Sequence, residues 1–351
     1  MNPSSSCSGV SAERRRLPQA QSAALCRDAA TTNGATRRTF LTRSLQAVAA
    51  FGLARAATAD LLAATSSPAR YPVRLGGPLF AKAEDPEEWV LAHRKLGYGA
   101  AYCPGVSLND TGRIAAFKAA AAKHNLVIAE VGRWVNLLDA DPEKRAANLK
   151  LVTEGLALAE AIDARCCVDI AGSLSPKEWY GPHPDNLSKK FLDAAVENAR
   201  KIIDAVKPKR AKFCYEMMGW AIPDSADSYL KLIKAIDRKG FGVHLDPCNG
   251  VNSPEKFYRN AALIEECFDK LGKWIVSCHA KDLAWEVEMN VHFKEVRPGT
   301  GAVDYEAYLR CLAQMPQSPP LMLEHLPNAE EYDRAREHIL AVGKRVGVAF
   351  V

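Results

Sequence analysis

The sequence has no long uninterrupted hydrophobic run, no C-x-x-C pair and no G-x-G-x-x-G turn. The first absence argues against a stable membrane anchor, because a spanning helix needs about 20 consecutive apolar residues. The second excludes a zinc ribbon or a thioredoxin-type motif, although the chain contains 10 cysteines whose pairing the sequence leaves open. The third removes the phosphate-binding turn of a doubly wound dinucleotide-binding sheet.

A basic surface is also missing from most of the chain, despite a formal net charge of +5 over 351 residues. Residues 1–59 hold eight arginines, no lysine and two acidic residues, which gives this stretch a net charge of +6 and leaves −1 for the remainder. The body of the protein is therefore close to neutral. Without a basic stripe, we expect no nucleic-acid partner.

The amino-terminal stretch has the order of features of a twin-arginine export signal. Residues 36–41 read Thr-Arg-Arg-Thr-Phe-Leu, an alanine-rich run that one arginine interrupts follows at 44–59, and 57–59 read Ala-Thr-Ala. A small-x-small triplet after a mildly apolar run is typical of a cleavage site. We predict a cleavable signal region at 1–59, a linker at 60–72, export to the periplasm and contact with the twin-arginine translocase. A basic tail or an amphipathic helix is the alternative interpretation.

From about residue 73, eight apolar runs alternate with helical patterns. Apolar runs without clean alternation are typical of parallel strands that helices cover on one side. Several of the helical patterns open with a capping residue followed by proline, as in Asp85-Pro86 and Asp141-Pro142. Eight such units in one domain predict a single (β/α)8 TIM barrel over 73–351, with a doubly wound sheet as the alternative. The expected strands are 73–79, 99–102, 126–131, 166–170, 212–216, 243–246, 274–279 and 321–324, and the expected helices are 85–96, 112–124, 141–163, 188–206, 227–239, 253–272, 305–315 and one from 328 onward.

Four successive predicted strands each end on an acidic or imidazole side chain. These residues are Glu216, Asp246, His279 and Glu324. The active sites of barrels lie at the carboxyl ends of their strands, so the four side chains are expected to meet. Carboxylates with one imidazole suit a divalent cation such as Mn²⁺, Mg²⁺, Co²⁺ or Zn²⁺. The sequence therefore predicts one metal ion with these four ligands.

Together with short motifs around them, these residues resemble the xylose isomerase-like TIM-barrel superfamily, in its sugar phosphate isomerase/epimerase branch with an AP endonuclease 2-type domain. The motifs that carry the resemblance are Leu245-Asp246-Pro247, His279-Ala280-Lys281-Asp282, Arg297-Pro298-Gly299-Thr300-Gly301 with Asp304, and Leu323-Glu324-His325, alongside Glu216. The resemblance covers about 73–349. It implies a divalent metal on the four ligands, with Glu216 and Glu324 also moving the substrate proton. Lys281 is a candidate to stabilise developing negative charge, or else a lysine in an ion pair.

Further residues are expected to line a substrate pocket. Glu130, Trp134, His183 and Arg297 lie in or beside loops after predicted strands three, four and seven. Aromatic side chains, including Trp179 and Tyr180 before His183, suit stacking on sugar faces. His244 points the same way as Asp246 but one layer deeper, so we expect it to support the pocket rather than the metal. His325 should point away from the barrel interior. Asn249 stands where the resembling ketose 3-epimerases have a substrate-contacting histidine, which leaves the substrate open.

The predicted function is a metal-dependent sugar isomerase or epimerase that acts on a small keto sugar or oxidised sugar derivative through an enediolate. The alternative is a metal-dependent lyase or dehydratase on a keto sugar, a 3-keto-glycoside or an inosose-like substrate. DNA repair would need a larger histidine cluster, and a metal-free glycosidase that uses Glu216 and Glu324 would leave Asp246 and His279 without a role. A binding protein without catalysis is the non-enzyme alternative. The sequence is compatible with a homo-oligomer.

Overall fold

A computed structural model of the protein describes residues 68–351. The predicted signal region and most of the predicted linker lie outside the described residues. Within 68–351, no helix combines the length and the apolar character that a membrane span requires.

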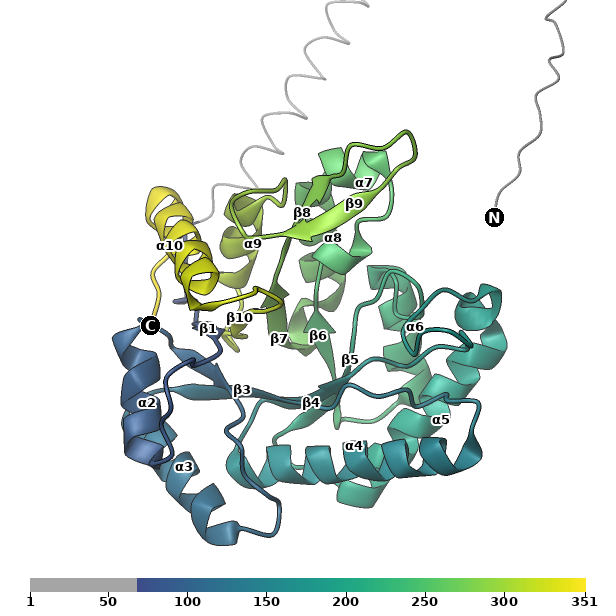
Figure 1. Ribbon diagram of the computed structural model, residues 1–351, viewed down its shortest axis with the longest axis horizontal. Helices are drawn as coiled ribbons and strands as arrows, with labels where there is room; N and C mark the ends of the chain where they lie inside the picture. Colours follow the sequence, from purple (N-terminus) through teal and green to yellow (C-terminus); the bar gives the residue numbers. More distant parts are fainter. Residues whose placement is uncertain (1–67) are drawn as a thin grey trace, which may run out of the picture. The chain divides into compact units, whose positions relative to one another are not determined.

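Eight parallel strands close into a barrel with helices between them, which confirms the predicted (β/α)8 fold. Figure 1 shows the helices packed around the strands. Around the ring the strand order is β1-β10-β7-β6-β5-β4-β3-β2, so that chain neighbours pair except where a two-stranded ribbon intervenes. The barrel strands are β1 (Leu75–Gly77), β2 (Ala100–Tyr102), β3 (Val127–Gly132), β4 (Cys166–Asp169), β5 (Lys212–Glu216), β6 (Phe241–Leu245), β7 (Ile275–Ala280) and β10 (Leu321–Leu323).

The helices begin where the capping residues predicted them. The side chain of Asp85 accepts the amide protons of Glu87 and Glu88, and Asp141 does the same for Glu143 and Lys144. Each cap satisfies amide groups that have no partner inside the helix. The helices are α2 (Pro86–Lys95), α3 (Thr111–Lys123), α4 (Pro142–Ile162), α5 (Lys189–Val206), α6 (Ala226–Ile236), α7 (Pro254–Tyr258), α8 (Asn260–Leu271), α9 (Tyr305–Leu312) and α10 (Ala329–Val346), with short 3₁₀ turns at Pro184–Leu187, Cys248–Gly250 and Gly272–Trp274.

Two segments differ from the sequence prediction. The expected helix over 253–272 is divided at Arg259, whose φ of −121° interrupts the helical backbone between α7 and α8. The polar segment after β7, expected to be a loop, contains an antiparallel ribbon of β8 (Asp282–Trp285) and β9 (Phe293–Val296). The two strands of the ribbon hydrogen-bond to each other, so their backbone groups are satisfied although the ribbon is not part of the barrel. Figure 1 shows the ribbon beside α7.

The core has two parts. A large apolar cluster fills the layer between strands and helices, and small residues fill the lower barrel interior, among them Ala100, Ala129 and Cys214. A Cβ atom on Gly76 would lie 2.5 Å from the Sδ atom of Met322, which explains why a glycine stands in that strand. All eight cysteines in the described part of the chain are free thiols. Above this apolar floor the interior turns polar.

Candidate metal centre

The four predicted ligands come from adjacent strands and lie at the same end of the barrel. Glu216 is the last residue of β5, and His279 is the last but one of β7. Asp246 and Glu324 directly follow β6 and β10. Because β5, β6, β7 and β10 are neighbours in the ring, the carboxyl ends of the strands bring all four side chains together.

One donor atom from each of the four lies within 4.8 Å of the others. The Nδ1 atom of His279 is 2.8 Å from Glu216 Oε1, 2.7 Å from Glu324 Oε1 and 3.9 Å from Asp246 Oδ2. All four residues are buried, with Asp246 and His279 fully inaccessible to solvent. This is a converging donor set rather than a scatter of surface acids.

Lys281 lies in the same cluster. Its Nζ atom is 2.9 Å from Asp246 Oδ2, 2.7 Å from Glu324 Oε1 and 3.6 Å from Glu216 Oε1. The side chain is buried, and yet it also contributes to the wall of the cavity above the cluster. Two tyrosines of α9 hold the backbone here, because the Tyr305 hydroxyl donates to the Lys281 carbonyl and the Tyr308 hydroxyl donates to the His279 carbonyl.

The charges of the cluster are strongly coupled. Burial alone would raise the pKa of Glu216, but the positive charges of Lys281 and His279 outweigh burial and lower this pKa to about 2. Burial would lower the pKa of His279, but the carboxylates of Glu324, Glu130 and Glu216 raise it well above its usual value. Burial raises the pKa of Asp246, which Lys281 offsets only in part. The site thus concentrates negative charge that attracts a cation.

The donor set fits a divalent metal ion. Asp246 Oδ2 and Glu324 Oε1 are buried oxygens that accept no hydrogen bond from any described residue, although the Lys281 ammonium lies close to both. Both point into the cluster, beside the imidazole of His279. Three carboxylates and one imidazole are typical ligands of Mn²⁺, Mg²⁺, Co²⁺ and Zn²⁺. The same residues that the strand ends predicted therefore form a candidate metal site.

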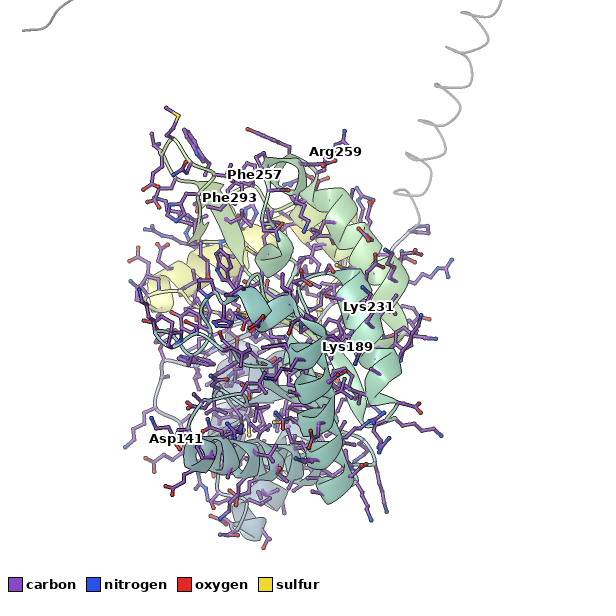
Figure 2. The ribbon with its side chains drawn as sticks, turned by 90° about the vertical axis from the view of Figure 1, so that its right-hand side faces the viewer. Asp141, Lys189, Lys231, Phe257, Arg259 and Phe293 are labelled. Atoms are coloured by element: carbon purple, nitrogen blue, oxygen red, sulfur yellow. The ribbon has the colours of Figure 1, made fainter. Side chains whose placement is uncertain are left out.

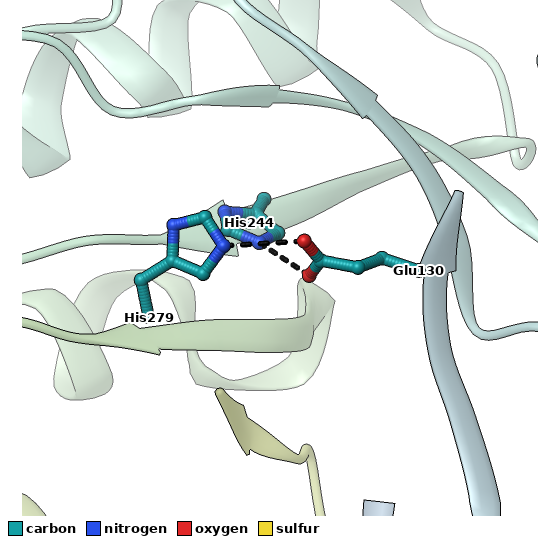
Figure 3. Close-up of side chains that lie close together, drawn as sticks. All are labelled: Glu130, His244 and His279. Carbon is teal, nitrogen blue, oxygen red and sulfur yellow. Dashed lines mark hydrogen bonds and ion pairs between the residues drawn. The ribbon is translucent and has the colours of Figure 1, made fainter. Parts of the chain in front are cut away.

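A second polar layer lies below the ligands. Glu130 of β3 reaches across the barrel, where its Oε1 atom is 3.2 Å from His279 Nε2 and its Oε2 atom is 2.8 Å from His244 Nε2 (Figure 3). Ser277 donates its hydroxyl to Glu130 Oε2 at 2.9 Å. Burial would raise the pKa of Glu130, but His244 and His279 lower it below its usual range. Glu130 is thus a buried carboxylate that hydrogen-bonds to three neighbouring side chains.

A cavity of about 510 Å³ opens above the ligands. This size suits a small molecule. Asn249 lies at its edge and donates from Nδ2 to the Met217 carbonyl at 3.0 Å and to Glu216 Oε1 at 3.4 Å. The lining residues are Trp134, Ile170, Trp179, Tyr180, Glu216, Met218, Asn249, Lys281, Glu295, Glu324 and His325.

Some residues predicted to contact substrate lie elsewhere. Glu130 and His244 are 1% and 0% exposed, beneath the ligands rather than on the cavity wall. His183 caps the turn at Pro184–Leu187 by accepting the Asp185 amide proton on Nδ1. The guanidinium of Arg297 is held by Glu331 at 2.9 Å. None of these four residues is part of the cavity lining, whereas Trp134 and Asn249 are.

His325 was expected to point away from the interior, and that expectation is wrong. Its φ of +58° turns the chain directly after Glu324, so that its side chain lines the cavity. There its Nδ1 atom lies 3.2 Å from Glu295 Oε2 of the ribbon. Sequence analysis also missed Glu295, because the ribbon that carries it was expected to be a loop. Residues 293–296 read Phe-Lys-Glu-Val, without the apolar-polar alternation that predicts a strand, so the sequence contains no clear signal for it.

Asp282 holds the base of the ribbon and the Pro298-Gly299-Thr300-Gly301 turn. Its two carboxylate oxygens accept four backbone amide protons, from Leu283, Gly299, Gly301 and Val303, at 2.9 to 3.0 Å. On the outer side, Phe293 of the ribbon stacks on Phe257 of α7, with ring centroids 4.9 Å apart (Figure 2). These contacts fix the ribbon that places Glu295 at the cavity.

The family is established by comparison of the sequence with known protein families. The sequence profile of the xylose isomerase-like TIM-barrel family matches residues 92–342, and this chain belongs to that family. No curated protein matches the sequence at a significant level.

Solved structures share the fold at low sequence identity. A xylose isomerase-like TIM-barrel protein from Mycobacterium smegmatis, in complex with magnesium, is 19% identical, with a TM-score of 0.55, over 79% of this chain and 98% of that one. The 3-keto-D-glucoside 4-epimerase of E. coli is 14% identical, with a TM-score of 0.55, over 78% of this chain and all (100%) of that one. A probable 3-DHS dehydratase from Bacillus anthracis is 14% identical, with a TM-score of 0.56, over 78% and 100%. At these identities the likeness extends to the fold alone.

Proposed function

We propose that this protein is a metal-dependent enzyme that isomerises or epimerises a keto sugar or an oxidised sugar derivative through an enediolate. The observation that carries the proposal is the convergence of Glu216, Asp246, His279 and Glu324 within 4.8 Å at the floor of a cavity of about 510 Å³. A sugar epimerase and a magnesium-bound protein among the structures with the same fold support the same choice.

A divalent ion on these ligands, whether Mn²⁺, Mg²⁺, Co²⁺ or Zn²⁺, would polarise a substrate carbonyl and so acidify the neighbouring C–H bond. Glu216 and Glu324 belong to β5 and β10, which stand on either side of β6 and β7 in the ring. Their carboxylates can therefore approach a bound sugar from two sides, one to remove the proton and the other to return it.

Lys281 is suited to stabilise the developing oxyanion. Its ammonium lines the cavity while Asp246 and Glu324 hold it in place. A fixed cation at the site of developing negative charge is effective because it needs no reorganisation during the reaction. Trp134, Trp179 and Tyr180 also line the cavity, where their rings can stack on the sugar and exclude water.

Proton exchange tests the proposal. Wild-type protein incubated with keto sugars and oxidised glycosides in D₂O should incorporate deuterium next to the carbonyl, and a Glu324→Gln variant that still binds Mn²⁺ should lose this exchange by about 100-fold or more. Absence of exchange with every sugar tested, by a protein that carries its metal, would contradict the proposal.

An elimination reaction is the second candidate, and His325 is the observation that favours it. Its imidazole lies at the cavity wall beside Glu324, where it can protonate a departing hydroxyl or aglycone. The same enediolate then loses a β-substituent instead of being reprotonated. Product mass separates the two reactions, since isomerisation conserves mass and elimination removes water or an alcohol. His325→Gln should abolish elimination but leave α-proton exchange.

Export by the twin-arginine route is also proposed, on the basis of Arg37-Arg38 and the Ala57-Thr58-Ala59 triplet. Replacement of both arginines by lysine should keep the protein in the cytoplasm, whereas cell fractionation should find the wild type in the periplasm. An unchanged distribution would refute this localisation.

A further inference from the structure

We infer that Glu130 is a positioning residue that orients His279 for metal binding, rather than a residue of the substrate wall. The inference rests on the proposed function, because it concerns the same metal site. It concerns how the barrel presents one particular nitrogen atom of His279 to the other three ligands.

The geometry begins with the two nitrogens of the His279 ring. Nδ1 faces the oxygens of Glu216 and Glu324 at 2.8 and 2.7 Å, while Nε2 faces Glu130 Oε1 at 3.2 Å (Figure 3). Glu130 comes from β3, across the barrel from β7. Its side chain is 1% exposed and His279 is inaccessible, so water does not compete for either group.

The carboxylate of Glu130 determines which atoms carry protons. An ionised carboxylate only accepts hydrogen bonds, so His279 Nε2, His244 Nε2 and the Ser277 hydroxyl must all donate to it. A metal ion that displaced the Nδ1 proton would bind the lone pair there, while the Nε2–H group still donated to Glu130. The second ring nitrogen of a metal-binding histidine is commonly held in this way.

His244 completes the arrangement. Its Nδ1 atom is buried and has no hydrogen-bond partner among the described residues. A proton on that atom would remain unsatisfied, at a cost of about 1–3 kcal/mol, whereas a proton on Nε2 is donated to Glu130 at 2.8 Å. Its ring also packs edge-on against His279, with centroids 4.2 Å apart. His244 and Ser277 thus fix the Glu130 carboxylate, which in turn fixes His279.

The direct test is the affinity of Glu130→Gln for Co²⁺. An amide offers one oxygen and one NH₂ group, so it cannot accept a hydrogen bond from both His279 Nε2 and His244 Nε2 as the carboxylate does. Co²⁺ should bind about 10- to 100-fold more weakly than to wild type, with a change in the visible d–d spectrum. Asp169→Asn is the matched control, since Asp169 is another inaccessible carboxylate whose bonds go to the Val135 and Ile170 amides. That control should keep wild-type affinity.

A measurement on the wild type keeps the inference testable if Glu130→Gln does not fold. In ¹¹³Cd-loaded protein, ¹H–¹⁵N spectra should show the His279 ring protonated on Nε2 and coupled to cadmium through Nδ1. Cadmium on Nε2, or wild-type Co²⁺ affinity in a folded Glu130→Gln protein, would overturn the inference. Failure of the proposed function looks different, because the wild type then binds Cd²⁺ and Co²⁺ as predicted without exchanging any substrate proton.

Discussion

The ammonium of Lys281 lies 2.9 Å from the Oδ2 atom of Asp246, and the two residues are only 5% and 0% exposed. Removal of one member of a buried ion pair leaves the other uncompensated, which typically costs about 3–5 kcal/mol. Lys281→Met should therefore lower the free energy of unfolding of the metal-free protein by that amount. Saturating Mn²⁺ should restore much of the loss, because a cation then compensates the carboxylates. Urea unfolding with and without Mn²⁺ measures both effects.

Lys270→Met is the matched control for that experiment. Lys270 also contacts two carboxylates, Asp227 at 2.8 Å and Glu266 at 2.6 Å, but both acids are largely exposed. Surface pairs contribute about 1 kcal/mol or less. Equal destabilisation by the two substitutions would mean that Lys281 does not compensate the buried charge.

Asn249 is expected to support catalysis through Glu216. Its amide donates to Glu216 Oε1 at 3.4 Å and to the Met217 carbonyl at 3.0 Å. Loss of a hydrogen bond to a charged group costs about 1.5 kcal/mol, so Asn249→Ala should lower kcat/KM for proton exchange about tenfold. Asn198→Ala serves as control, because Asn198 donates to the Leu137 carbonyl and neither residue lines the cavity. A comparable loss in the control would show a general effect of stability.

Gly301 should not tolerate a side chain. A Cβ atom there would collide with the Asp282 carboxylate and the Leu283 carbonyl, both part of the network that holds the ribbon base. Overpacking of this kind costs about 1–3 kcal/mol, so Gly301→Ala should lower the melting temperature and displace Glu295 from the cavity. Gly105→Ala is the control, since its Cβ would meet nothing within 4 Å. Thermal unfolding of both variants measures the effect. Equal decreases in melting temperature would contradict the predicted role of Asp282.

Stability should depend on pH through His93. This residue is 2% exposed, and burial lowers the pKa of His93, which its hydrogen bond with the Trp89 carbonyl offsets in part. The unfolded chain therefore takes up a proton at a higher pH than the folded protein. The stabilisation is complete above about pH 6.5 and is lost as the pH falls, by at most about 1.4 kcal/mol per pH unit. His93→Gln should show a shallower loss between about pH 7 and pH 5 in urea titrations. Parallel profiles would exclude His93 as the source.

The barrel and the convergence of the four candidate ligands were predictable because both depend on local patterns. A strand that ends on Glu216, or directly before Asp246, shows its candidate residue directly in the sequence, and ring order follows from chain order. The layer of the barrel interior that each side chain occupies cannot be predicted from such local patterns. Glu130 was placed on the substrate wall, yet it lies two residues before the end of β3, paired with Cys166, and so points to the layer below the ligands.

Contacts with distant parts of the chain explain the other differences between the predicted and the observed site. Arg297 has the charge and loop position of a substrate-binding residue, but Glu331 in the first turn of α10 holds its guanidinium. His325 entered the cavity through a left-handed backbone conformation that is uncommon outside glycine and that no neighbouring residue in the sequence indicates. A sequence pattern of a few residues cannot predict such contacts between distant segments.

Metal content tests the central claim most directly. Wild-type protein dialysed against Mn²⁺ and analysed by inductively coupled plasma mass spectrometry should contain about one divalent ion per chain. Asp246→Ala, folded as judged by circular dichroism, should contain almost none, because it lacks the fully buried oxygen that points into the cluster. A wild-type protein without bound metal, or an Asp246→Ala protein with the full wild-type content, would contradict a metal centre at Glu216, Asp246, His279 and Glu324.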